Sequence, residues 1–193
     1  MVLKMYLFVD TETTGLPPSQ LNRLSQWPRM VQLGWLLTDD TGEVLRQDST
    51  LIRPDGFKIP QRVTHIHGIT TNQAYQTGIP MEDALHRFKE GLRFTHVLIG
   101  HNIDYDYHVM KAEFKRKKIQ TLLDQYPRFC TMKSSRVIEF CKVMRGDGKP
   151  KWPGLRELYR HLFHEKYRGA HDAYGDAKAC AQCFFKLRDM GVI

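Results

Sequence analysis

Cysteine is scarce in this sequence, and long apolar runs are absent from it. The chain has 4 Cys among 193 residues and no secretory leader, which predicts reduced thiols and a cytoplasmic location rather than a disulfide-linked secreted scaffold. The N-terminal apolar run is only a few residues long, contains Lys4 and ends at Asp10. We therefore expect neither a signal peptide nor a membrane span, and no membrane partner.

Internal repeats, low-complexity tracts and interdomain linkers are also missing. A length of 193 residues suits one domain, and 41% hydrophobic with 26% charged residues is ordinary for a soluble globular protein. We predict a single domain over residues 1–193.

Acidic residues are outnumbered by basic ones. The 21 Asp and Glu stand against 29 Lys and Arg, so the net charge is +8. A polyanionic partner such as nucleic acid would explain this positive excess. Solubility alone is the alternative, because many basic proteins bind no nucleic acid, and charge by itself leaves both open.

Four of the acidic residues stand where apolar side chains would be expected. Asp10 and Glu12 close the apolar run, and side chains two apart in a strand point to one face, so these carboxylates would lie side by side. Asp106 and Asp176 each share the apolar i, i+3, i+4 stripe of a predicted helix. Burying several unpaired carboxylates is too costly unless a cation neutralises them. Because all-oxygen ligands select hard ions such as Mg²⁺ or Mn²⁺, the pattern predicts a metal-dependent enzyme.

The position of an acidic residue on its strand or helix is more informative in this sequence than its spacing from a histidine. The spacing that relates His101 to Asp106 recurs between His108 and Glu113 on the same predicted helix. These last two residues lie off the apolar stripe, so we expect them on a solvated helix face.

Alternating and apolar patterns predict an α/β fold in which helices flank one mixed sheet. Three strand-like runs come first, two of them joined by the hairpin signal Asp-Asp-Thr-Gly at residues 39–42. Strand and helix patterns alternate later, which favours parallel strands there. A mixed segment runs through residues 65–68, and residues 15–29 and 142–154 look irregular. The expected strands are residues 4–10, 30–38, 44–52, 96–100 and 129–132, and the expected helices are 81–94, 104–118, 154–164 and 172–190.

Four segments together resemble the motifs of the DEDDh exonucleases, the relatives of the proofreading epsilon subunit of bacterial replicative DNA polymerase. In chain order these segments are residues 10–17, 66–70, 100–106 and 170–177. The resemblance covers essentially the whole chain, and Tyr105 stands where the family often has Phe. It implies a ribonuclease-H-like fold. It also implies metal binding by Asp10, Glu12, Asp106 and Asp176, with His171 as general base.

The resemblance further implies a pocket for the terminal nucleotide. Thr13 and the segment 66–68, with Ile66 and His67, would line it, and we place His101 and Asn102 of the third motif among the candidate substrate contacts. His101 also competes with His171 for the role of base. It directly follows a buried strand, where a histidine more often supports or caps its neighbours, so we favour His171.

The chemistry of phosphodiester hydrolysis needs these residue types. Two divalent cations, Mg²⁺ or Mn²⁺, held roughly 4 Å apart can neutralise charge on the phosphoryl oxygens and on the departing 3'-oxygen. Asp10 could be shared between them, with Glu12, Asp106 and Asp176 completing an oxygen shell. A neutral imidazole such as that of His171 can take the proton of the attacking water.

Other clusters carry weaker signals. Cys180 and Cys183 lie on an apolar helix stripe and are expected in the core. His161 and His164 lack a partner ligand set and are expected to be exposed or capping. Residues 115–118, all basic, end a helix, where cations meet the dipole. A better strand-binding candidate is the glycine-rich segment that contains the residues Lys142, Arg145, Lys149, Lys151 and Trp152, although this Trp could instead anchor the next helix.

We therefore predict a 3'-5' exonuclease that acts on 3' ends of single-stranded DNA and releases nucleoside 5'-monophosphates. The alternatives are an exoribonuclease that trims RNA 3' ends, a non-catalytic nucleic-acid-binding module on the same fold, and an endonuclease of the ribonuclease H type. The sequence ends at Ile193, directly after the last predicted helix. We therefore expect a free-standing repair or processing enzyme, while proofreading in association with a polymerase stays open.

Overall fold

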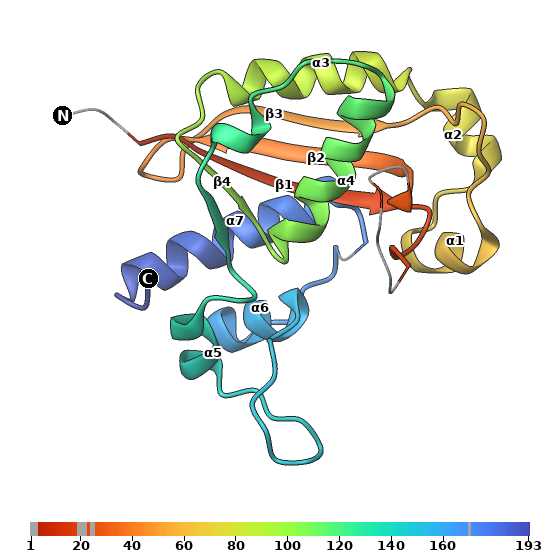
Figure 1. The fold of residues 1–193 in the computed structure, drawn as a ribbon. Coiled ribbons are helices and arrows are strands. Elements are labelled where there is room, and N and C mark those ends of the chain that lie inside the picture. The colour runs from red at the N-terminus through yellow and green to blue at the C-terminus, as the bar shows by residue number, and fades with distance from the viewer. Residues whose placement is uncertain (1–3, 19–22, 24–25, 170) are drawn as a thin grey trace.

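A five-stranded mixed sheet forms the centre of the computed structural model, which describes residues 4–18, 23, 26–169 and 171–193 (Figure 1). Its strands are β1 (Tyr6–Thr13), β2 (Met30–Thr38), β3 (Val44–Leu51), β4 (Val97–Gly100) and β5 (Arg128–Cys130). They are ordered β3-β2-β1-β4-β5, with antiparallel pairing among the first three and parallel pairing of β1 with β4 and of β4 with β5. The predicted order of antiparallel and then parallel strands is confirmed.

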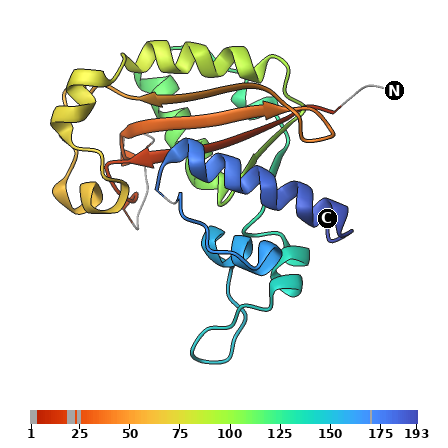
Figure 2. The same ribbon diagram turned by 180° about the vertical axis from the view of Figure 1, so that it is seen from behind.

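Helices cover both faces of this sheet. They are α1 (Gln61–His67), α2 (Thr71–Thr77), α3 (Met81–Leu92), α4 (Ile103–Arg116), α5 (Ser135–Cys141), α6 (Leu155–Phe163) and α7 (Ala173–Asp189). α3 and α4 lie on one face and α7 on the other, as the two opposite views show (Figures 1 and 2). α5 and α6 pack together beside α7, and α1 and α2 lie beyond the end of β1.

Alternation along β1 supplies side chains to both layers. Leu7 and Val9 join one buried cluster with Phe88 of α3. Phe8 points the other way and meets Phe184 of α7, with ring centroids 5.5 Å apart. Because full burial of a side chain of this size contributes about 1.5–3 kcal/mol, the two layers clamp β1 firmly between them. The strand that carries Asp10 and Glu12 is therefore packed on both faces.

Several elements differ from the sequence expectation. β1 continues to Thr13 because β2 keeps pairing beside it, with Glu12 opposite Gln32. Helices α1 and α2 replace part of the mixed segment before residue 81, and α5 and the 3-10 helix η2 (Leu123–Gln125) were not expected. Each of α1 and α2 has 7 residues and a single buried side chain, Val63 and Ala74, so neither could show a helical period.

Glu113 shows that the predicted solvated face of α4 is wrong. Its side chain is 0% exposed. Arg29 Nε and Arg116 Nη1 each lie 2.8 Å from Oε1, which also accepts the backbone N–H of Met30 at 3.2 Å. His108 is half-buried as well, and its ring stacks on Trp27. Arg116, one turn along α4, and Arg29, which is 84 positions away, together offset the cost of burying this carboxylate. A periodic pattern cannot reveal the contact with Arg29.

The cysteines behave as expected. Cys180 and Cys183 are buried in α7, and the four cysteines, all described, form no disulfide with one another. Among the described helices, none is both long and apolar enough to cross a membrane.

Candidate active site

Asp106 reaches β1 because β4 is shorter than its neighbour. Parallel pairing between β1 and β4 runs only from Tyr6 to Phe8, and β4 ends at Gly100. α4 begins three residues later and places Asp106 in its first turn. The open edge of β1 is then filled by this carboxylate, since Oδ1 of Asp106 accepts both the backbone N–H of Thr11 at 2.9 Å and its hydroxyl at 2.7 Å.

Two residues of β2 hold the first turn of α7 against the sheet. A Cβ built on Gly34 would lie 2.1 Å from the backbone nitrogen of Tyr174, so only glycine allows this approach. Gln32 donates its amide to Oδ1 of Asp172 at 2.7 Å and accepts the N–H of Ala173 at 3.1 Å. Asp172 in turn caps α7 through its bond with the N–H of Gly175 at 2.9 Å. Since Gly34 is the partner of Asp10 in the sheet, α7 begins directly over the carboxylates of β1.

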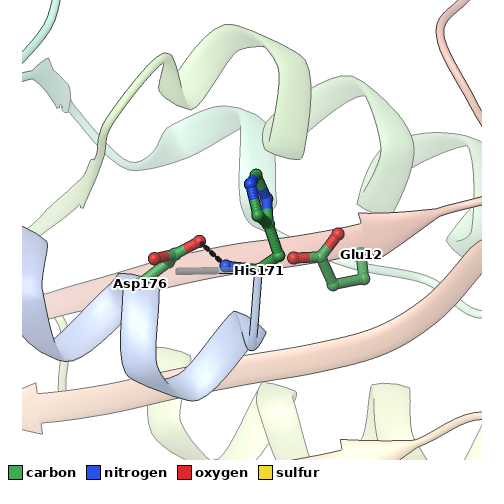
Figure 3. Close-up of side chains that lie close together, drawn as sticks. All are labelled: Glu12, His171 and Asp176. Atoms are coloured by element: carbon green, nitrogen blue, oxygen red, sulfur yellow. Dashed lines mark hydrogen bonds between the residues drawn. The ribbon is translucent and has the colours of Figure 1, made fainter. Parts of the chain in front are cut away.

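Glu12, His171 and Asp176 come together at this point (Figure 3). One possible ligand atom from each lies within 4.8 Å of those of the other two. The backbone N–H of His171 donates to Oδ2 of Asp176 at 2.9 Å. His171 has a left-handed φ of 71°, a conformation that few residues with a Cβ adopt. Its exposed side chain thus stands between two predicted metal ligands.

The predicted carboxylates of the site raise one another's pKa values. Burial and then the charges of Asp106, Asp176, Glu12 and Asp172 raise the pKa of Asp10 well above its ordinary value. Burial, followed by the charges of Asp176 and Asp106, raises the pKa of Glu12 to about 8. Burial also raises the pKa of Asp106 to about 7, although Thr11 opposes this. All four predicted carboxylates are therefore close enough to repel one another.

This donor set fits hard divalent cations. Its carboxylate oxygens suit Mg²⁺ or Mn²⁺, whose charge would relieve the repulsion. Oδ1 of Asp176 is buried and has no hydrogen-bond partner among the described residues. The phenol of Tyr167 lies beside that carboxylate without meeting hydrogen-bond geometry, and burial followed by the charge of Asp176 raises the pKa of Tyr167. This buried oxygen without a partner is the observation that best fits a cation ligand.

A cavity of about 490 Å³ opens next to Glu12. Three predicted substrate contacts line it: Thr13, Ile66 and His67. At its rim, Leu16 and Ile66 are exposed apolar side chains. The full lining is Thr11, Glu12, Thr13, Gly15, Leu16, Arg62, Val63, Ile66, His67 and Tyr105.

Tyr105 and His67 shape this cavity from within the protein. The Tyr105 hydroxyl donates to the carbonyl of Gly15 at 2.6 Å and contacts the hydroxyl of Thr13 at 2.6 Å, which ties the turn after β1 to α4. The Nδ1 of His67 accepts the N–H of Ile69 at 3.0 Å, so the neutral ring carries its proton on Nε2. Burial lowers the pKa of His67 and favours this neutral form.

His101 and Asn102 lie off the cavity. Nδ1 of His101 accepts the hydroxyl of Thr131 at 2.9 Å, and Nε2 donates to the carbonyl of Pro153 at 2.9 Å. Burial lowers the pKa of His101 to about 4, so the ring is neutral near pH 7. Asn102 caps α4 with a left-handed φ of 77° and makes no side-chain cap bond. His101 therefore ties the segment after the basic loop, the one that carries Lys142, Arg145, Lys149 and Lys151, to the end of β4.

The basic loop before α6 projects away from the sheet (Figure 1). In this loop, Arg145 pairs with Asp147 at 3.7 Å, and Lys151 pairs with Glu157 of α6 at 2.7 Å. Trp152 is 56% exposed, and Lys133 lies over its ring. Strand binding by this loop stays a prediction.

His164 caps the C-terminus of α6 with a left-handed φ of 58°.

Several site residues escaped the sequence reasoning. Gln32 stands inside an otherwise apolar strand, and that polar interruption was a usable signal. Gly34 offered a second one, because glycine inside a strand often marks close approach of another backbone. For Thr11, nothing in the sequence pointed to Asp106, 95 residues away.

The chain matches a known family over nearly all of its length. The family model RNase_T, described as Exonuclease, matches residues 7–184. No curated protein matches the chain significantly.

Solved exonuclease I structures share its fold. A product-bound exonuclease I aligns with a TM-score of 0.76 at 18% identity, over 96% of this chain and 43% of the other. The E. coli exonuclease I in complex with a dA16 oligonucleotide gives 0.75 at 21%, over 98% and 42%. A moderately thermophilic exonuclease I from Methylocaldum szegediense gives 0.73 at 20%, over 96% and 40%. The chain spans about two fifths of these proteins, and at such identities the likeness establishes the ribonuclease-H-like fold alone.

Proposed function

Because the chain belongs to the RNase_T family of exonucleases, we propose that it removes nucleotides one at a time from the 3' end of single-stranded DNA. The reaction would release nucleoside 5'-monophosphates. The observation that supports this most is the convergence of Glu12, Asp176 and His171 beside a cavity that could hold one terminal nucleotide.

Each group at the site has a role in such a reaction. Asp10, Glu12, Asp106 and Asp176 would hold two divalent cations, Mg²⁺ or Mn²⁺. When bound, these cations supply positive charge for the phosphoryl oxygens and for the departing 3'-oxygen. His171 would take the proton from the water that attacks phosphorus, because its side chain is exposed and lies between Glu12 and Asp176.

The cavity would orient the strand end. Leu16 and Ile66 offer apolar contact to a base, while Thr13 and His67 offer polar groups deeper inside. The bond between phosphorus and the 3'-oxygen of the preceding sugar then breaks, and the shortened strand carries a new 3'-hydroxyl. Orientation of this kind supplies much of the rate in phosphoryl transfer.

The test is a side-by-side digestion of single-stranded DNA, duplex DNA and RNA of matched sequence, labelled at the 5' end. We expect a ladder of shortened labelled strands from single-stranded DNA, dependent on added Mg²⁺ or Mn²⁺ and abolished by a chelator. Release of label as the first product, cleavage of circular single strands, or hydrolysis by metal-stripped protein would contradict the proposal. Faster digestion of RNA would select the exoribonuclease alternative.

A further inference from the structure

A second, basic pocket lies against α6, apart from the cavity beside Glu12. Its volume is about 260 Å³, and its lining consists of Arg156, Glu157, Arg160, Lys166 and Tyr167. Arg156 and Arg160 are one helical turn apart and so share a face of α6. Lys166 comes from the segment that leads from α6 toward α7.

The positive charge of this pocket exceeds its negative charge, because Arg156, Arg160 and Lys166 stand against Glu157 alone in the lining. Its one acid, Glu157, is already engaged, because Oε1 accepts Lys151 Nζ at 2.7 Å and Oε2 accepts the N–H of Gly154 at 2.8 Å. Among the described residues, no carboxylate lies within ion-pair distance of Arg156, Arg160 or Lys166, and all three are exposed. Exposed cations in excess over acids around a concave surface favour an anionic ligand.

Tyr167 connects this pocket to the candidate active site. A Cβ added to Gly169 would lie 2.9 Å from its hydroxyl oxygen, and one added to Gly175 would lie 3.0 Å from it. The phenol therefore packs closely against the first turn of α7. The same phenol lies beside the carboxylate of Asp176. One aromatic ring therefore separates the basic pocket from a predicted metal ligand.

The two pockets lie on opposite sides of the carboxylates. The nucleotide cavity is built by β1 and α1 and reaches Glu12, whereas the basic pocket is built by α6 and reaches Asp176 through Tyr167. In Figure 1, α1 and α6 lie on different sides of the end of β1. A strand whose last nucleotide sits in the cavity would leave the carboxylates toward α6.

We propose that the pocket of Arg156, Arg160 and Lys166 binds a backbone phosphate of the single strand, on the 5' side of the bond that is cleaved. This inference rests on the proposed exonuclease function. Guanidinium groups donate paired N–H bonds to phosphate oxygens and suit such a contact. The contact would hold the strand while successive ends enter the cavity.

The experiment compares Arg156→Gln/Arg160→Gln with Arg87→Gln/Arg93→Gln, which removes the same charge from α3 and its C-cap residue. Affinity for a 5'-fluorescein oligothymidylate of about 20 nucleotides is measured by anisotropy over a salt series, in the Asp10→Asn background. We expect the α6 variant to bind about tenfold more weakly. The slope of log K against log salt is negative, and its magnitude should decrease by about 0.7 for each lost phosphate contact. The α3 variant should match the parent in both respects.

Steady-state rates of the otherwise wild-type enzyme complete the test. The loss in kcat/KM for the α6 variant should be larger on the long strand than on a dinucleotide, which cannot span both pockets. Binding and a salt slope equal to those of the α3 variant would overturn the inference, as would equal losses on both substrates. If wild-type protein hydrolyses no strand at all, the proposed function itself fails, which is visible without either variant.

Discussion

Thr11 gives both its backbone N–H and its hydroxyl to a single oxygen of Asp106, at 2.9 and 2.7 Å. The two residues are 95 positions apart, and the bonds occupy the edge of β1 that β4 leaves open. One oxygen of Asp106 is thereby fixed and the other is left for the candidate metal site. Its carboxylate is buried, with 3% exposure, so the loss of a donor cannot be made up by water.

Replacing Thr11 with Val keeps the shape of the side chain but removes the hydroxyl. We expect a loss of about 1.5–3 kcal/mol in the free energy of unfolding, the range for hydrogen bonds to charged groups, together with weaker metal activation. Thr41→Val is a matched control, because Thr41 also donates its N–H and hydroxyl to one oxygen, Oδ1 of Asp39, in an exposed turn. Chemical denaturation and metal titration measure both effects. Equal losses in the two variants would contradict a special role for the buried pair.

Adding a methyl group to Gly34 should separate α7 from β2. The new Cβ would stand 2.1 Å from the backbone nitrogen of Tyr174 and 2.3 Å from the carbonyl carbon of Ala173, so the backbone must move. Because Asp176 and His171 belong to this part of the chain, Gly34→Ala should lower activity by more than about tenfold, as misplacement by an ångström can. Gly146→Ala has open space around its Cβ and serves as control. Full activity in Gly34→Ala would show that the site tolerates displacement of α7.

His171 as general base predicts a large effect on turnover. His171→Ala should reduce kcat by about two to four orders of magnitude. If it only transfers a proton, the metal concentration that gives half-maximal activity should stay close to that of the wild type, whereas Asp176→Asn should raise it. A rise in His171→Ala would instead make His171 a ligand, which its distance to Glu12 and Asp176 permits.

His101→Ala is the companion variant. Both ring nitrogens of His101 form hydrogen bonds within the protein, so this change should lower the melting temperature and leave kcat close to that of the wild type. If His101→Ala instead lost turnover as severely as His171→Ala is expected to, the assignment of the base would have to be reversed.

Glu12 should make stability depend on pH when no divalent cation is present. Its pKa is about 8 in the folded protein against an ordinary 4.5, so the folded state binds the proton more tightly. The resulting stability is fully present below pH 4.5 and is lost as pH rises through 8. Glu12→Gln should therefore unfold at a higher temperature than wild type above pH 8, and this difference should vanish toward pH 4.5.

Added Mg²⁺ should narrow the difference between the two proteins above pH 8, because a cation would neutralise the carboxylate that the variant lacks. The exposed Glu43→Gln variant should follow the wild-type curve throughout. A Glu12→Gln protein less stable than wild type at high pH would mean that Glu12 is held by an attractive partner rather than repelled.

The local part of this site could be predicted from the sequence. Alternation places Asp10 and Glu12 on one face of a strand, and helical spacing turns Asp106 and Asp176 toward the core, because both periods report the face of a single element. The order of antiparallel and parallel strands followed from the same patterns.

Which elements meet was decided only by the tertiary structure. The length of β4 leaves room for Asp106 beside Thr11, and Gly34 together with Gln32 admits α7 close enough to bring His171 to Glu12. Glu113 was misjudged for the same reason, since Arg29, one of the two arginines that allow its burial, is 84 positions away in the sequence. A periodic pattern records how one segment divides between core and solvent. The contacts that make a buried charge tolerable, or align a base with a carboxylate, arise only when distant segments pack.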